Sequence, residues 1–187
     1  EFLQHPLTLR IYCEVANPTR QQFVGVEALP NSFSALFEEH FKRVGARIAD
    51  LAPSTHRIHQ DEVQEALLKI AGHLWEHNTR SMEFQVARSA INQGVPWTQS
   101  MLYALESADV LIRTSQAADD QGVAFPYDLM AGHLQARYLL TKPELATWLR
   151  SPDAAVLFQH DPYRSSHTFG RDVLQALVSL YPSYHQG

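Results

Sequence analysis

The sequence predicts a mainly α-helical fold with one small β-hairpin. Apolar residues recur at intervals of three and four residues through most of the chain, which is the spacing of amphipathic helices. Two short β-prone runs, Val110–Thr114 and Val123–Tyr127, flank a polar turn and predict the hairpin. An apolar fraction of 45% with 10% aromatic residues in 187 residues excludes a disordered chain.

The net charge argues against nucleic-acid and membrane partners, and the cysteine content indicates the cellular compartment. Fifteen Lys and Arg stand against 20 Asp and Glu, so the formal net charge of −5 provides no field for nucleic acid or an anionic membrane. The longest uncharged stretch, Ser89–Leu105, contains Gly94 and Pro96 and is no membrane span. Cys13 is the single cysteine, which predicts a reducing, cytoplasmic location, and we expect it to be buried as a small apolar residue.

Residues 1–53 are predicted to form a helical domain of two packed helices. Pro6 favours the first position of a helix. The second helix is expected to be capped by Asn31 or Ser32. The apolar faces consist of Leu7, Ile11 and Val15 in the first helix, and of Phe33, Phe37, Phe41, Val44, Ile48 and Leu51 in the second.

Residues 54–140 are predicted to form a winged helix-turn-helix. Three helices come first, the second closed by Gly94 and the third capped by Thr98. The hairpin follows, and Asp128 is expected to cap a further helix. The order helix, helix, helix, hairpin, helix is the basis of this prediction. The expected apolar positions are Val63, Leu67, Ile70, Leu74, Phe84, Ala87, Ala90, Ile91, Met101, Leu102, Leu105, Ala108, Leu129, Met130, Leu134, Leu139 and Leu140.

Residues 141–187 are predicted to begin an α-helical array. Thr141–Glu144 fits a capping box, and a short helix is expected to start at Ser151-Pro152. A last helix is expected to end at Pro182. Its apolar face consists of Phe169, Val173, Leu177 and Leu180.

A short motif raises one catalytic alternative. His73, Glu76 and His77 match the H-x-x-E-H pattern of inverted zinc peptidases, in which two histidines hold zinc and the glutamate activates its water. The chain is short for that class, and no third ligand stands out. A solvated helix end, with the histidines near its negative dipole, is the preferred interpretation, and we expect no metal site.

The glycines argue against nucleotide hydrolysis by this chain alone. None of the eight glycines is followed by Lys, and no two are spaced as G-x-G. Neither a Walker A loop nor a dinucleotide-binding loop is therefore present. We expect no catalytic residues here and no enzyme activity.

A winged helix also suggests a DNA-binding regulator, which is a second alternative. The helix that would enter the major groove runs from Thr98 to Ala108. No Lys or Arg lies between Arg88 and Arg113, whereas Glu106 and Asp109 are acidic. Because phosphate contacts need cations, the sequence favours a winged helix that contacts protein domains.

Three segments resemble one family. His5–Glu14 (HPLTLRIYCE) resembles the N-P-L-x-L-x-x-x-C-E segment that follows the ATPase core of NACHT-type STAND P-loop NTPases. Leu29–Ser32 with Leu36–Phe41 is similar to the next helix of that family. Val123–Leu140 resembles its F-x-H/Y-D-x-x-x-x-x-L-x-A-R-x-L block, in a form most similar to bacterial antiphage members.

The resemblance implies a regulatory segment of an ATPase engaged in signalling or antiviral defence. ATP with Mg²⁺ would be bound by an upstream NTPase domain, with Pro6 close to the adenine. Tyr127 stands where many members have a histidine that reaches the phosphates. A tyrosine offers a hydroxyl but no positive charge, so Tyr127 is interpreted either as a nucleotide contact or as hairpin packing. The implied partners are the NTPase domain, a downstream helical sensor domain and a protein target.

The ends of the sequence agree with this expectation. The chain begins Glu1-Phe2 without Met and stops shortly after an amphipathic segment. We therefore expect it to be a piece of a longer protein in which it controls nucleotide-dependent switching and oligomerisation.

Overall fold

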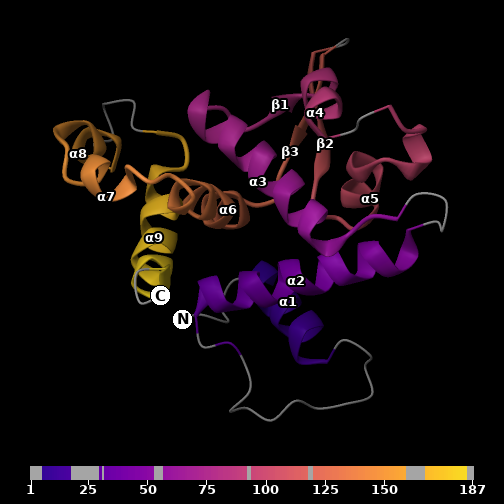
Figure 1. Ribbon diagram of the computed structural model, residues 1–187, viewed down its shortest axis with the longest axis horizontal. Coiled ribbons are helices and arrows are strands. Elements are labelled where there is room, and N and C mark those ends of the chain that lie inside the picture. Colours follow the sequence, from indigo (N-terminus) through magenta and orange to yellow (C-terminus); the bar gives the residue numbers. More distant parts are fainter. Residues whose placement is uncertain are drawn as a thin grey trace.

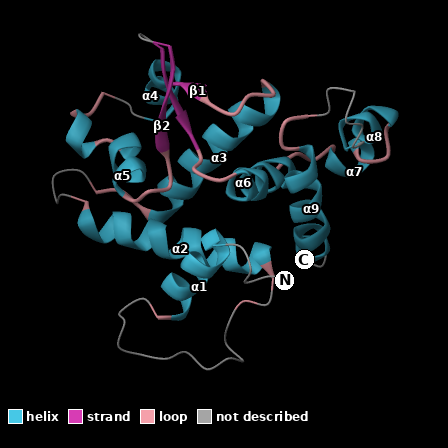
Figure 2. Cartoon of the chain, turned by 180° about the vertical axis from the view of Figure 1, so that it is seen from behind, coloured by secondary structure: helices cyan, strands magenta, loops and turns pink. Residues whose placement is uncertain are grey.

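The computed structural model describes residues 6–17, 30, 32–52, 57–91, 94–117, 120–158 and 167–184. Helices make up most of this part of the chain, and a small antiparallel sheet projects on one side (Figures 1 and 2). The prediction of a mainly α-helical fold with one hairpin is confirmed. Within the described ranges, no helix is long and apolar enough to cross a lipid bilayer.

The first two helices, α1 (Pro6–Ala16) and α2 (Phe33–Leu51), pack against each other as predicted. Ser32 caps α2, because its hydroxyl accepts a hydrogen bond from the Ala35 amide at 3.1 Å. Asn31, the other expected cap, lies outside the described residues. The apolar face of α2 is covered except at its end, where Leu51 is 78% exposed.

The expected burial of Cys13 is wrong, since its side chain is exposed. Ile11 and Val15 are one turn apart on α1 and both are buried. Each residue advances the helix by about 100°, so a residue two positions from both lies on the opposite face. Cys13 therefore faces away from the core.

The middle of the chain forms a three-stranded sheet framed by helices. In chain order it contains α3 (Gln60–Glu76), β1 (Met82–Glu83), α4 (Phe84–Ile91), α5 (Met101–Ser107), β2 (Ile112–Ala117), β3 (Asp120–Ala124) and α6 (Asp128–Leu140). The strands pair antiparallel in the order β1-β3-β2, with Met82 opposite Val123 and Thr114 opposite Gly122. Strand β1 has only two residues, which is too short for the alternation of apolar and polar residues by which a strand is recognised, so the sequence does not predict it.

Two predicted helix caps are wrong. Thr98 lies in a short 3-10 helix, Trp97–Gln99, and it is the Ser100 hydroxyl that caps α5 by accepting from the Tyr103 amide at 3.1 Å. Tyr127 occupies the position before α6. Asp128 lies in the first turn instead, where both of its oxygens accept hydrogen bonds of 2.7 Å from Arg80.

The last part contains α7 (Leu145–Trp148), α8 (Pro152–Phe158) and α9 (Gly170–Tyr184). The capping box at Thr141–Glu144 is wrong, because the Thr141 hydroxyl donates to the Tyr138 carbonyl at 2.7 Å and the start of α7 has no side-chain cap. Helix α9 runs two residues past Pro182. The expected end at Pro182 is therefore two residues early. A proline lacks one backbone N–H donor, and because Pro182 lies in the last turn of α9, the helix continues past it.

Helix α6 lies at the centre of the core, packed against α3 on one side and α9 on another (Figure 1). Two glycines make these approaches close. A Cβ on Gly72 of α3 would lie 2.6 Å from the Tyr138 ring, and a Cβ on Gly132 of α6 would lie 2.9 Å from the Asp172 carbonyl carbon of α9. Buried residues of α1 to α7 and of α9 belong to one continuous cluster. The domain boundaries after residues 53 and 140 stay predictions.

The contact between α6 and α9 can be tested with Gly132→Ala. We expect the free energy of unfolding in a urea titration to fall by about 1–3 kcal/mol, because the added methyl meets rigid α9 backbone. Gly45→Ala is the matched control within α2: its Cβ meets the flexible Gln60 side chain at 3.0 Å, and alanine favours a helix by about 1 kcal/mol. Equal effects of the two substitutions would contradict the close approach of α6 and α9.

Candidate functional site

Tyr127 lines a polar cleft of about 120 Å³ between α1, α2, the turn after α5 and the start of α6. Its side chain is 37% exposed. Pro6, the other residue assigned by the resemblance, begins α1 one helical turn before Arg10, which also lines the cleft. The structure thus brings Tyr127 and α1 to the same cleft, although they are far apart in the sequence.

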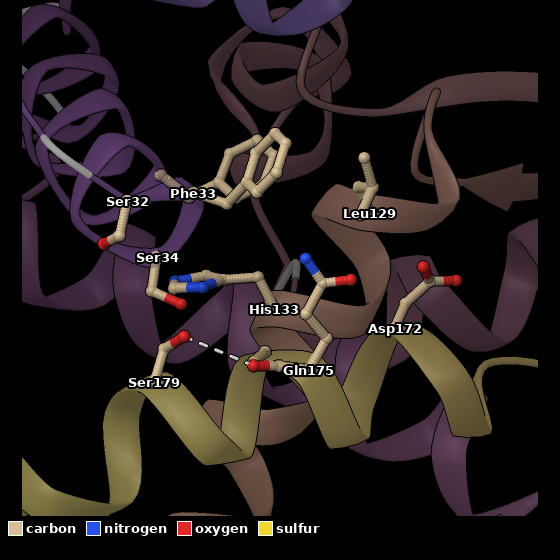
Figure 3. Close-up of a pocket in the computed structure, with 10 residues that line it drawn as sticks. Ser32, Phe33, Ser34, Leu129, His133, Asp172, Gln175 and Ser179 are labelled. Atoms are coloured by element: carbon tan, nitrogen blue, oxygen red, sulfur yellow. Dashed lines mark hydrogen bonds between the residues drawn. The ribbon is translucent and has the colours of Figure 1, made fainter. Parts of the chain in front are cut away.

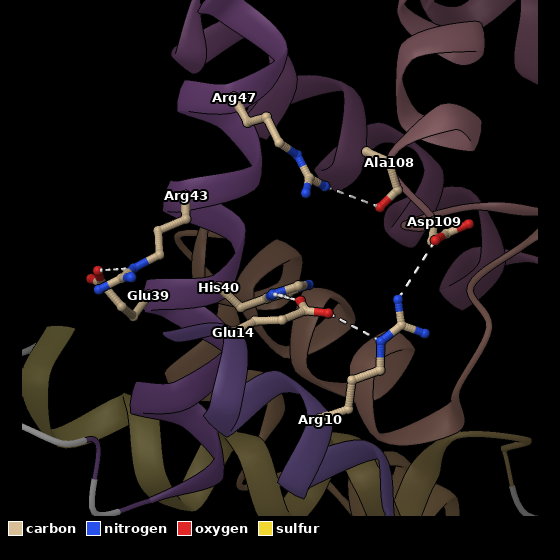
Figure 4. A network of polar contacts seen from close by, with 8 residues as sticks. All are labelled: Arg10, Glu14, Glu39, His40, Arg43, Arg47, Ala108 and Asp109. Atoms are coloured by element: carbon tan, nitrogen blue, oxygen red, sulfur yellow. Dashed lines mark hydrogen bonds and ion pairs between the residues drawn. The ribbon is translucent and has the colours of Figure 1, made fainter. Parts of the chain in front are cut away.

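Four polar side chains of the cleft form a connected network (Figure 4): Arg10, Glu14, His40 and Asp109. Arg10 and Glu14 are one turn apart on α1, and Arg10 Nε lies 3.0 Å from Glu14 Oε1. The other end of the Arg10 guanidinium lies 3.6 Å from Asp109 Oδ2. Glu14 Oε2 lies 3.7 Å from His40 Nδ1 of α2. The network therefore links α1 both to α2 and to the turn after α5.

Asp109 owes its position to an unusual backbone conformation. Its φ is 56°, in the left-handed region that favours glycine. The Val110 and Asp109 amides donate to the Leu105 and Glu106 carbonyls, which is the Schellman pattern of a helix end. An aspartate at this position, in place of the usual glycine, provides a carboxylate for Arg10.

The charges within the cleft balance. Two arginines, Arg10 and Arg47, and two carboxylates, Glu14 and Asp109, line it. Burial lowers the pKa of His40 and outweighs the opposing effect of Glu14, so the ring is neutral near pH 7. Arg47 donates to the Ala108 carbonyl at 3.4 Å. The cleft offers hydrogen bonds and a tyrosine hydroxyl, but its described lining carries no net charge with which to hold a triphosphate.

The residues of the zinc motif contact one another and α6. The rings of His73 and His77 stack with centroids 4.0 Å apart, and His77 Nδ1 lies 3.0 Å from the His73 carbonyl. Glu76 accepts a hydrogen bond from the Tyr138 hydroxyl and lies 3.8 Å from Lys142 Nζ. Among the described residues, no three His, Cys, Asp or Glu side chains are grouped as a metal site would require.

Arg113 is the first cation after α5 in the sequence, and contacts with α4, α5 and Trp97 hold it in place. Arg113 of β2 pairs with Glu106 at 2.9 Å, and its guanidinium lies over the rings of Phe84 and Trp97 at 4.4 and 4.9 Å. These contacts hold Arg113 between α4, α5 and the sheet.

A buried polar cluster joins α2 and α6, and sequence periodicity does not reveal it. His133 of α6 is 1% exposed, and its Nε2 lies 3.2 Å from Glu38 Oε1 of α2. Arg137 Nε lies 3.3 Å from the same oxygen. Burial lowers the pKa of His133. Burial alone would raise the pKa of Glu38, but the hydrogen bond from His133 and the charge of Arg137 lower it overall. The cluster therefore holds a neutral imidazole, a carboxylate and a guanidinium.

Comparisons of this chain with models of protein families, with curated proteins and with solved structures find no match. The resemblance of its three segments to STAND NTPases therefore stays a prediction.

The buried histidines predict a pH dependence of stability. The native state keeps His40 and His133 neutral below the ordinary pKa of 6.5, whereas the unfolded chain takes up protons there. The free energy of unfolding should therefore fall as the pH is lowered from about 7 to about 5. Each such histidine contributes a slope of up to about 1.4 kcal/mol per pH unit. The lowered pKa of Glu38 affects stability only at more acidic pH.

Urea titrations at several pH values measure this slope. His40→Gln should reduce it, and His133→Gln provides a second, independent measurement. A slope of the native chain that neither buried substitution reduces would contradict the neutral assignment.

Proposed function

We propose that this chain is the regulatory helical and winged-helix segment of a STAND ATPase, where it controls nucleotide-dependent switching and oligomerisation in signalling or antiviral defence. The observation that carries the proposal is the cleft that Tyr127 shares with α1, because the resemblance assigns these two segments to the nucleotide. The order α3, β1, α4, α5, β2, β3 and the sheet order β1-β3-β2 support a winged helix in the middle of the chain.

Because its charges balance, the cleft is suited to form one side of a nucleotide-binding site rather than the complete site. ATP carries several negative charges, and the two arginines already face two carboxylates. An upstream NTPase domain would hold the phosphates and Mg²⁺ with its P-loop. This chain would then contribute α1 and the Tyr127 hydroxyl, which can donate or accept a hydrogen bond.

The packing of α6 suggests how a nucleotide signal could travel. Tyr127 directly precedes α6, and α6 packs along α9. A displacement of one end of this buried helix would change its contact with the C-terminal helices. Engagement of a protein target by downstream helices would act in the reverse direction, because coupling between two sites is reciprocal.

The alternative of a DNA-binding regulator is less well supported. Helix α5 carries no Lys or Arg, and the next cation in the sequence, Arg113, is paired with Glu106 and stacked on two rings. Helix α2 also contacts the end of α5, with Arg47 donating to the Ala108 carbonyl. A recognition helix needs free cations and an open face.

Tyr127→Phe tests the nucleotide role in the longer protein that carries the NTPase domain. We expect nucleotide affinity, measured by titration with a fluorescent ADP analogue, to fall about fivefold, which corresponds to one hydrogen bond of about 1 kcal/mol. Tyr103→Phe on α5 is the matched control, since Tyr103 is 39% exposed and Tyr127 is 37% exposed. An unchanged affinity in Tyr127→Phe would leave hairpin packing as the role of this residue.

The same proposal predicts no salt-dependent binding of this chain to duplex DNA. Fluorescence anisotropy at low and at physiological salt measures this directly. Binding that weakens steeply with salt would favour the DNA-binding alternative, because it indicates phosphate contacts.

A further inference from the structure

An apolar groove of about 260 Å³ lies between the end of α2 and α5 (Figure 1). Ile48 and Ile58 line its floor and are buried. Its two rims are exposed, because Leu51 of α2 is 78% exposed and Tyr103 of α5 is 39% exposed. Leu51 is the most exposed large apolar side chain in the part of the chain that the structure describes. An apolar hollow with exposed apolar rims is typical of a surface that contacts another molecule.

The charge of the groove is positive. Arg47 lines it, and its described lining residues include no Asp or Glu. Two other hollows of the molecule differ in this respect. The pocket between α2, α6 and α9 is lined by Asp172 (Figure 3), and the Tyr127 cleft is lined by two arginines and two carboxylates. Of these three hollows, the groove is therefore the one that favours a negatively charged ligand.

Arg47 forms no ion pair with a residue that the structure describes. Its guanidinium donates one hydrogen bond, to the Ala108 carbonyl at 3.4 Å (Figure 4). The carboxylate of Asp109, next to Ala108, lies 3.6 Å from Arg10 instead. A guanidinium has five N–H donors in a planar fork that matches a carboxylate, so Arg47 can accept a second partner. A carboxylate supplied by a ligand would form charge-assisted hydrogen bonds with it.

The exposed rims favour a segment of a polypeptide over a small molecule. The groove has room for roughly nine non-hydrogen atoms, which is enough for one large apolar side chain and a carboxylate. A small molecule of that size would leave the outer surface of Leu51 in water, whereas a chain that continues past the groove would cover it. Arg57 directly precedes Ile58, is exposed and has no ion pair among the described residues, so it can meet a further carboxylate. Tyrosine and arginine, both present here, contribute strongly to protein interfaces.

We propose that the groove between α2 and α5 binds an acidic segment of a partner protein. One large apolar side chain of that segment packs on Ile48 and Ile58, and a neighbouring carboxylate pairs with Arg47. The segment also covers Leu51 and Tyr103. The inference is independent of the proposed nucleotide role, because neither Tyr127 nor any residue of α1 lines the groove.

The test uses a capped pentapeptide of sequence DELFE as the probe. Binding is followed by ¹H–¹⁵N NMR titration of this chain at a pH of about 7.5, where the peptide carboxylates are ionised. We expect saturable shifts in α2 and α5. The neutral peptide NQLFQ and the peptide DEAAE, which lacks large apolar side chains, should each bind about fivefold more weakly. The basic peptide KKLFK should not shift these residues. Equal binding of NQLFQ, of DEAAE or of KKLFK would overturn the proposal.

Two substitutions at exposed side chains test the two contacts without disturbing the core. Arg47→Gln should weaken binding of DELFE about fivefold, because the ion pair is lost, and Arg88→Gln on α4 is the matched control outside the groove. Leu51→Ala should also weaken binding, and Val178→Ala on α9 is its control, since Val178 is 70% exposed.

Unchanged affinity for DELFE in either Arg47→Gln or Leu51→Ala would refute the proposed geometry. The same residues of α2 and α5 should not shift when the chain alone is diluted. If they do, the groove is occupied by a second copy of this chain, and the proposal is wrong.

Discussion

The burial of α6 is the constraint on which the rest of the structure depends. This helix contacts α2, α3 and α9, and residues Met130–Gln135 are all buried. A helix surrounded in this way has little amphipathic character, so glycines rather than a polar face decide how closely its neighbours approach. Gly132 admits the backbone of α9, and Gly72 of α3 admits the Tyr138 ring. The Tyr127 cleft borders this helix at Met130, and a pocket between α2, α6 and α9 borders it at Leu129 and His133.

Several polar groups within this core are paired across elements that are distant in the sequence. His167 illustrates the pattern: its Nε2 lies 2.8 Å from the Trp75 carbonyl, its Nδ1 accepts from the Phe169 amide, and its ring stacks on Trp75. Asn78 adopts a left-handed φ of 50° at the end of α3, and its side chain accepts from the Thr168 amide. These contacts connect the end of α3 to the start of α9. Against this pattern, several buried polar atoms have no hydrogen-bond partner among the described residues, including His133 Nδ1 and both amide atoms of Gln135 on α6.

Much of the fold can be predicted from periodicity, whereas the sites depend on tertiary contacts. Helices α1, α2 and α3 follow from apolar residues at intervals of three and four, and the hairpin follows from two β-prone runs. The cap expected at Thr98 is wrong because Ser100, another hydroxyl residue near the same helix start, takes that role. The cap expected at Asp128 is wrong because its carboxylate pairs with Arg80, which is 48 positions away in the sequence. The pairing of His133 with Glu38 joins residues 95 positions apart, and no local pattern reveals it.

The exposure of Cys13 has a practical consequence for studying this molecule. It is the single thiol of the chain, and it lies on the outer face of α1, two residues from the buried Ile11 and Val15. A spin label or fluorophore attached there would reside on the helix that lines the Tyr127 cleft, yet outside the core. Maleimide chemistry could therefore attach one label to α1 without prior mutagenesis. The mobility of that label would report on the motion of α1.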